Sequence, residues 1–225
     1  MPQPPLGWRF ASAIMSISPK QRALGAGIEE KTRSLELYEP GSRKPGDIWF
    51  AVSRKGAGHT NMTYNSFYKV DSVQGSERFS GGVRQMELDK DRHHGLVYRF
   101  SDAAVAQRAA HLAYSWKGDV GYADGGGGKG LPFRTIGSYA GTSHFGRGAQ
   151  GRLMKYKSRE GMRPKNVICS EMCILAYQLC MAENHAGFIQ LDAKHSTPAT
   201  LMDYFDGPGS AHWQLVAYKK GTGDL

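Results

Sequence analysis

The sequence predicts an α+β fold in which one buried helix packs on an antiparallel β-sheet. Short β-prone runs follow one another between Asp47 and Phe100, and another lies near the C-terminus. The segment from Cys169 to Cys180, drawn as a helix, is apolar around nearly its whole circumference, which is typical of a helix surrounded by protein. With 225 residues and 40% hydrophobic content, the chain can form one domain with its own core.

We divide the chain into an N-terminal arm over residues 1–45 and a domain over residues 46–225. The arm begins with a Pro-rich extended segment, and a helix is predicted over residues 18–37. The short apolar stretch after Arg9 is interrupted by serines and has no small-residue cleavage site, so we expect no signal peptide. No apolar run reaches the length of a transmembrane segment.

The strands are predicted mainly in the first half of the domain. DIWFAVS is the first, and HTNMTYN and FYKVDSV are spaced as a hairpin around Asn65 and Ser66. VRQMEL and HHGLVYRF extend the series, and HWQLVAYK predicts a final strand. Each run is rich in the β-branched and aromatic residues that suit a pleated surface.

Two further helices are indicated by capping residues. Ser101 is the expected N-cap of a helix that runs to about Trp116, in which apolar residues recur at helical spacing from Val105 onward. A shorter helix is predicted after Pro198, with Ser196 or Thr197 as its cap.

Residues 118–163 are predicted to form a long irregular insertion, a mobile lid or a substrate-facing loop. Its GGGGKG run departs from a phosphate-binding loop, because Ala123 and Gly130 stand where that motif needs Gly and Ser or Thr. The letters GxGxxG at 146–151 follow no apolar strand. We therefore expect no nucleotide and no other cofactor.

The net charge of +9 favours anionic partners, such as nucleic acid, anionic lipid or bacterial cell wall. The alternative is a basic surface with no dedicated partner. The densest basic patch, residues 147–165, contains one aromatic residue and no nucleic-acid-binding motif. We therefore do not expect nucleic acid as a partner.

All three cysteines, Cys169, Cys173 and Cys180, lie within one predicted helix. An odd, clustered set argues against a disulfide scaffold and fits a chain made in a reducing compartment. The spacing along one helix matches no metal-binding pattern, so no metal site is expected. Cys173 and Cys180 are interpreted as small buried hydrophobic residues.

Cys169 differs because it occupies the first turn of its helix, directly after the β-prone pair Val167 and Ile168. Unpaired backbone N–H groups and the positive end of the helix dipole favour a thiolate at that position. A nucleophile and an ordinary core cysteine are both compatible with the helix pattern alone.

His59 is the strongest candidate for a base beside such a nucleophile. It opens a predicted strand after the glycine-rich turn at 56–58, where a ligand could approach the backbone closely. Asp71 lies on the next predicted strand, and an antiparallel pairing could place it adjacent to His59. Other histidines are assigned to solvated or helix-surface positions: His93, His94, His111 and His185.

The order of these motifs resembles the YiiX/YebB-like group, which are circularly permuted relatives of the NlpC-type papain-like cysteine hydrolases. PGDIWF and GH come first, followed by a pair of strands that carries a third polar residue of the site. A helix, ICSEMCILAYQ and STPATL come after it in that order. The match covers residues 45–205, with 118–163 unaligned. The resemblance implies a papain-like fold with Cys169 as nucleophile, His59 as general base and Asp71 as the residue that orients the imidazole. HTNMTYN is more polar than the usual strand of that group.

The resemblance implies hydrolysis at amide bonds through a thioester, by an amidase or endopeptidase acting on the peptide stems of peptidoglycan or on another anionic bacterial polymer. Compact, basic members without a signal peptide can be antibacterial toxins. Such effectors are made in the bacterial cytoplasm, delivered by type VI secretion to a target-cell periplasm, and matched by a cognate immunity protein. The alternatives are a protein deamidase, a transferase or a lipid acyl hydrolase using the same pair, and a non-catalytic basic binding domain.

Overall fold

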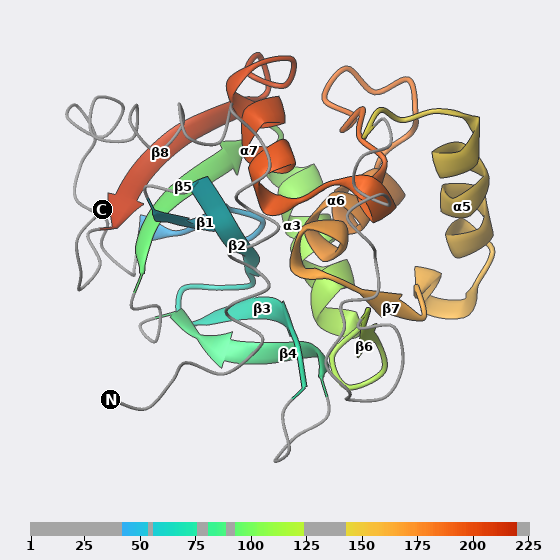
Figure 1. Ribbon diagram of the computed structural model, residues 1–225, viewed down its shortest axis with the longest axis horizontal. Helices are drawn as coiled ribbons and strands as arrows, with labels where there is room; N and C mark the ends of the chain where they lie inside the picture. Colours follow the sequence, from blue (N-terminus) through green and yellow to red (C-terminus); the bar gives the residue numbers. More distant parts are fainter. Residues whose placement is uncertain (1–41, 54–55, 76–80, 89–92, 124–142, 220–225) are drawn as a thin grey trace.

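A computed structural model describes residues 42–53, 56–75, 81–88, 93–123 and 143–219 (Figure 1). The arm helix predicted over 18–37 and the GGGGKG run lie outside the described residues.

The described strands form one sheet in the order β7-β6-β4-β3-β2-β1-β5-β8. Neighbouring strands run antiparallel, except that β6 and β7 are parallel. The sheet curls into a half-barrel (Figure 1), so the predicted α+β class with an antiparallel sheet is confirmed. The strands are β1 (Ile48–Ser53), β2 (Gly56–Thr63), β3 (Tyr68–Val73), β4 (Gly82–Glu87), β5 (His94–Phe100), β6 (Gly121–Tyr122), β7 (Asn166–Val167) and β8 (Trp213–Lys219).

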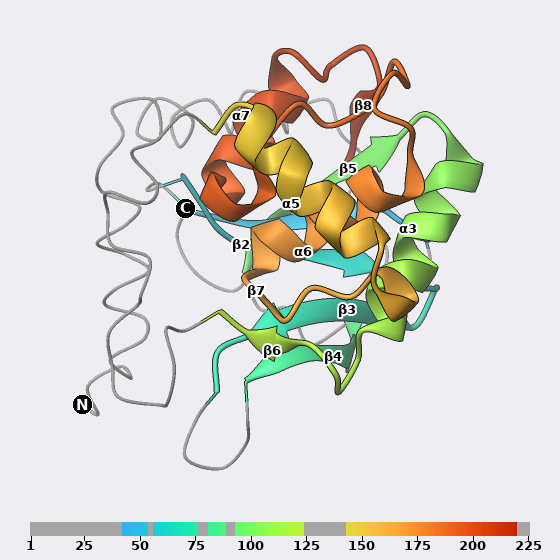
Figure 2. The same ribbon diagram turned by 90° about the vertical axis from the view of Figure 1, so that its right-hand side faces the viewer.

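Four α-helices in the described residues accompany the sheet. α6 lies between the sheet and α5, with α3 and α7 beside it (Figures 1 and 2). The helices are α3 (Ala103–Ser115), α5 (Arg147–Lys157), α6 (Cys169–Cys180) and α7 (Pro198–Asp206). Two 3-10 turns, Glu160–Met162 and Ala193–His195, precede β7 and α7 respectively.

The strands alternate between two environments, as their period of two residues requires. Ile48 and Phe50 of β1 join the main core beneath the helices, whereas Trp49 joins a small cluster with Val97 and Ala217. The helix-facing side of the sheet is therefore the side that carries the main core.

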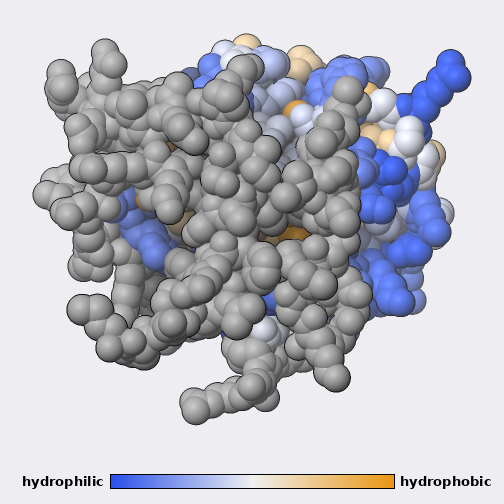
Figure 3. Space-filling model, viewed as in Figure 1, coloured by the Kyte–Doolittle hydropathy of each residue, from blue (hydrophilic) through white to orange (hydrophobic). Residues whose placement is uncertain are grey.

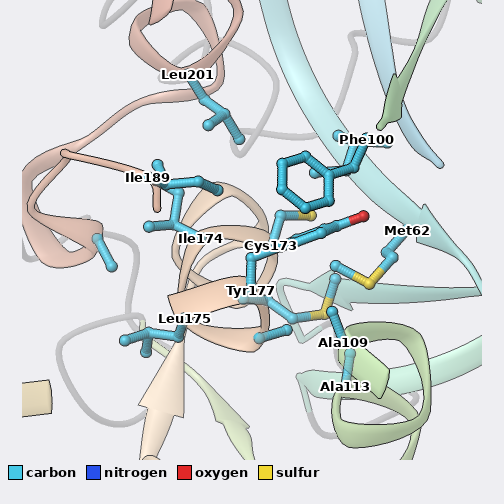
Figure 4. Packing of buried hydrophobic residues seen from close by; sticks show 14 of the residues in the cluster. Met62, Phe100, Ala109, Ala113, Cys173, Ile174, Leu175, Tyr177, Ile189 and Leu201 are labelled. Atoms are coloured by element: carbon cyan, nitrogen blue, oxygen red, sulfur yellow. The ribbon is translucent and has the colours of Figure 1, made fainter. Parts of the chain in front are cut away.

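The helix α6 is the centre of that core. Every residue from Cys169 to Leu179 is buried, as the all-round apolar pattern predicts. Figure 4 shows this helix between Met62 and Ala109 on one side and Ile189 and Leu201 on the other.

The polar groups of α6 find partners. Tyr177 donates from its hydroxyl to the carbonyl of Gly46 at 2.7 Å. Gln178 donates to the carbonyls of Ile189 and Leu191, each at 2.7 Å. A helix can be buried on all sides only if such polar groups are satisfied.

Two details of the helices differ from the sequence predictions. The N-cap of α3 is Asp102 rather than Ser101, because the Asp102 carboxylate accepts from the backbone N–H groups of Ala104 and Val105, each at 3.0 Å. For α7, Thr197 is the cap, and Pro198 takes the first helical position.

The insertion over 118–163 is not irregular throughout, since it contains β6 and α5. The glycines of the GxGxxG letters lie at the start of α5, with Gly146 as N-cap. Interior glycines lower helix propensity by about 1 kcal/mol each. Burial of Ala149 and Leu153 against the rest of the molecule outweighs that penalty, and a sequence pattern cannot show such burial.

Candidate active site

Cys169 is the first residue of α6, and only the N-cap residue Ile168 separates it from β7. The entry to the helix is fixed by Ser72 on β3, whose hydroxyl donates to the carbonyl of Val167 at 2.8 Å. Cys169 is buried, with 6% of the residue exposed, and the first backbone N–H groups of its helix have no intrahelical acceptors. The chain thus places one sulfur at the positive end of a buried helix.

The two residues after Cys169 anchor the helix start. Ser170 donates to the carbonyl of Ser196 at 2.7 Å, and Ser196 donates in turn to the carbonyl of Asp192 at 2.8 Å. Glu171 accepts from the backbone N–H of Ile168 at 3.4 Å, which closes the first turn. In the Cys-Ser-Glu run, Cys169 therefore supplies the thiol, Ser170 attaches the helix start to Ser196, and Glu171 caps the first turn.

His59 and Asp71 are brought together by the hairpin of β2 and β3. The imidazole Nε2 lies 3.0 Å from Asp71 Oδ2 and 2.9 Å from Asp71 Oδ1. Asp71 is almost fully buried, whereas 35% of the His59 side chain is exposed. The adjacency expected from strand pairing is present, and the histidine keeps an open edge toward solvent.

The pairing between β2 and β3 is short, which explains how the start of α6 can reach the side chains of His59 and Asp71. Only Met62 with Val70 and Thr63 with Lys69 are paired across the two strands. The strands part before they reach His59, at the level where Ser72 holds the β7–α6 junction. The start of α6 thus lies beside the open end of the hairpin.

Cys169 lies close enough to His59 to affect the protonation of the imidazole. Burial lowers the pKa of His59, but the negative charges of Asp71 and Cys169, together with hydrogen bonds to both, raise that pKa well above its usual value. Because Nε2 faces Asp71, Nδ1 is the ring nitrogen available to the thiol. The three side chains form a chain from carboxylate to imidazole to sulfur.

Such a chain is suited to a thiolate–imidazolium pair, because the raised pKa of His59 favours the protonated ring. The thiolate is the nucleophilic form of cysteine, and the imidazolium is a proton donor within reach of a leaving group. The arrangement is suited to nucleophilic attack on a carbonyl carbon followed by proton transfer.

The other two cysteines lie in different surroundings, although all three thiols are free. Cys173 is completely buried, and burial together with the charge of Cys169 raises its pKa well above the usual value. Cys180 is half-buried, less covered than its pattern predicts, and burial raises its pKa to about 11. Neither environment favours a thiolate.

The remaining histidines have other partners. His94, which we expected to be solvated, is buried, and its Nδ1 lies 2.8 Å from the Tyr218 hydroxyl because β5 pairs with β8. His185 and His195 lie 3.9 and 3.8 Å from the carboxylates of Asp102 and Asp192.

Sequence reasoning missed Asn61, which lies two residues after His59. Its side chain is fully buried, and both amide atoms lack a hydrogen-bond partner among the described residues. The spacing of two along one strand is the signal that could have identified it, because His59 and Asn61 project to the same side.

Within the described ranges, no three His, Cys, Asp or Glu side chains are arranged to bind a metal ion. None of the helices in the same ranges combines the length and apolar character needed to cross a membrane. No family model, curated protein or solved structure matches the chain. The geometry of Cys169, His59 and Asp71 is therefore the basis for assigning a function.

Proposed function

We propose that the protein is a cysteine hydrolase that cleaves amide bonds through a thioester on Cys169. The observation that carries the proposal is the contact of His59 with both Asp71 and Cys169 at the start of a buried helix. A nucleophile, a base and a carboxylate that orients the base are the groups that nucleophilic catalysis requires.

The reaction follows from the protonation states of the pair. The Cys169 thiolate attacks the amide carbonyl, and the His59 imidazolium gives its proton to the leaving amine as the C–N bond breaks. Neutral His59 then removes a proton from water, and the hydroxide attacks the thioester. The carboxylic acid leaves, and the thiolate and imidazolium are restored. Asp71 stabilises the imidazolium in both halves of the cycle.

Backbone N–H groups at the start of α6 supply the electrostatic part of the mechanism. The carbonyl oxygen gains negative charge when the thiolate attacks, and preorganised donors at that point lower the barrier. The first turn of α6 offers such donors beside the sulfur. The tether from Ser170 to Ser196 keeps this turn in place during the reaction.

We further propose that the chain is a permuted papain-like enzyme of the group it resembles. The order of His59, Asp71 and Cys169 along the chain supports this, because unpermuted NlpC-type enzymes have the cysteine before the histidine. A Cys-bearing helix packed on a curled antiparallel sheet is compatible with the same reading.

The proposed substrate is the peptide stem of peptidoglycan, since the group's chemistry includes it and a net charge of +9 favours anionic wall polymers. The same reasoning makes the protein a candidate antibacterial effector, delivered to a target-cell periplasm and opposed by an immunity protein.

The test is digestion of purified peptidoglycan by the wild type, Cys169→Ala and Cys173→Ala. New soluble fragments, identified by mass spectrometry, should form with the wild type and with Cys173→Ala but not with Cys169→Ala. Equal fragments from all three proteins would exclude the Cys169 mechanism. No fragments from any of them would exclude peptidoglycan, and the same variants would then be assayed on glutamine-containing proteins and phospholipids.

A further inference from the structure

The amide of Asn61 is a buried polar group without a hydrogen-bond partner among the described residues. The residue is 0% exposed, and neither its oxygen nor its nitrogen makes a hydrogen bond there. An unpaired buried amide destabilises the folded state, and such groups are rare in native proteins. A chain that keeps an asparagine at this position gains something other than stability from it.

A second unsatisfied atom lies on the neighbouring strand. Asp71 Oδ1 is buried and lies 2.9 Å from His59 Nε2, but the hydrogen bond of the imidazole goes to Oδ2, so Oδ1 accepts none among the described residues. The pairing of Met62 with Val70, continued by one residue, brings Asn61 opposite Asp71. Directly opposed side chains have their Cβ atoms about 5 Å apart. An amide without a hydrogen bond therefore lies opposite a carboxylate oxygen that can still accept one.

We propose that Asn61 is a positioning residue whose amide N–H donates to Asp71 Oδ1 and so holds the carboxylate against His59 Nε2. One bond satisfies both buried groups and fixes the rotation of the carboxylate. The amide group can be turned to present its nitrogen, because the two ends of an asparagine side chain have the same shape. This inference rests on the proposed function, since it concerns the same Cys169–His59 pair.

Other charged groups surround this carboxylate and define the background for a test. Lys69, two residues before Asp71 on β3, has its Nζ 5.6 Å from the centre of a Trp49 ring. Arg84 on β4 is paired with Asp71 across the sheet. Cys169 and Cys173 face the pair from α6. A substitution that leaves these groups in place changes only the amide.

Thr63 is the matched control for Asn61. It lies two residues further along β2, it is equally buried, and its hydroxyl also lacks a partner among the described residues. Its cross-strand neighbour, however, is Lys69 rather than Asp71. Thr63→Val therefore removes a buried polar group of the same kind without touching the carboxylate.

The experiment measures the rate of iodoacetamide reaction at Cys169 against pH, by peptide mapping of the full chain, and needs no substrate. In Asn61→Leu and Asn61→Ala the pH at which the reaction rate of Cys169 is half-maximal should rise by about one unit. Without the amide, the Asp71 carboxylate is held less firmly and stabilises the His59 imidazolium less strongly, and the imidazolium in turn stabilises the thiolate less strongly. Thr63→Val should leave this pH unchanged. The melting temperature of Asn61→Leu should fall, since the variant leaves Asp71 Oδ1 without the amide donor.

The outcomes separate this inference from the proposed function. A wild-type Cys169 that reacts only in the pH range of an ordinary thiol would overturn both. A reactive wild type with unchanged midpoints in both Asn61 variants would overturn the role of Asn61 alone. A shift as large in Thr63→Val as in Asn61→Leu would mean that packing of β2, and not the amide, sets the thiol reactivity.

Discussion

The electrostatic balance at His59 decides whether Cys169 can act as a nucleophile. Burial lowers the pKa of the imidazole, and Asp71 and Cys169 together raise it by more. Cys173 lies one helical turn away and has the opposite balance, because no histidine contributes to its pKa and burial dominates. Two thiols in the same helix thus differ through their neighbours as well as through their positions along the helix.

Asp71→Asn tests this balance through the pH dependence of activity. A raised His59 pKa means that the protonated imidazole persists to higher pH than a free imidazole, so activity should fall only above about pH 6.5. Asparagine removes the negative charge, so the imidazolium should deprotonate at lower pH. The alkaline limit of kcat/KM should move down by about one unit or more. Asp206→Asn, which alters the distant hydrogen bond to Tyr98, is the control and should keep the wild-type profile.

Much of the site could be predicted from single residues. The thiol at a helix start is a local feature that a pattern can show, whereas the glycine-rich segment before His59 is part of β2 and not a turn. The contact between His59 and Asp71 depends on strand register, and the two paired positions of β2 and β3 set it. The lack of a hydrogen-bond partner for the Asn61 amide could not be predicted from the sequence, because it depends on which groups the tertiary structure places around that side chain.

Among the elements, those with a strong local signal were predictable and α5 was not. The long strands other than β2 coincide with β-prone runs, and α6 and α7 begin where their first residues indicate; β2 begins at Gly56, because Gly56 and Ala57, predicted as part of a turn, pair with β1. Helix α5 contains glycines at 148 and 151, and it is stabilised by the burial of one narrow face. The cap of α3 was misplaced by one residue, because both Ser101 and Asp102 can cap a helix and only geometry selects one.

A pair of alanine substitutions tests which residue caps α3. Asp102→Ala should lower the free energy of unfolding by about 1 kcal/mol, because two backbone N–H groups lose their acceptor. Ser101→Ala should change it by less than about 0.5 kcal/mol, since the exposed Ser101 side chain does not cap the helix. Denaturant titration of both variants gives the comparison. Asp102→Asn separates the cap from the charge interaction with His185, and it should retain most of the stability.

At the scale of the whole molecule, the first described residues are tied to the sheet and to α6. Arg99 donates to both carboxylate oxygens of Asp47, at 2.9 and 2.6 Å, and Tyr177 of α6 donates to Gly46. The segment before β1 therefore connects the sheet with the helix that carries Cys169. The same helix also packs against β2, α3, α5 and α7. The position of the Cys169 sulfur therefore depends on the packing of all these elements.

The charge of the molecule is concentrated in one region. Residues 147–165 contain seven basic residues and one acidic residue, which account for six units of the net charge of +9. The side of the molecule that carries α5 is mainly hydrophilic where described atoms are visible (Figure 3). Two of the cations are partly neutralised, since Arg152 pairs with Asp192 and Arg163 with Asp119. Arg147 and Lys155 project from the exposed face of α5.

If this region guides the protein to an anionic wall, the position of a charge should matter as well as the total. Lys155→Glu and Arg108→Glu change the net charge equally, but Lys155 lies on α5 and Arg108 on the exposed face of α3. In the Cys169→Ala background, which prevents digestion, Lys155→Glu should weaken adsorption to peptidoglycan sacculi about fivefold to tenfold at low salt, and Arg108→Glu clearly less. Sedimentation with sacculi gives the bound fraction. High salt should remove the difference, because exposed charges are screened within about 10 Å at 0.1 M ionic strength. Equal weakening by both variants would show that total charge, and not the α5 surface, attracts the polymer.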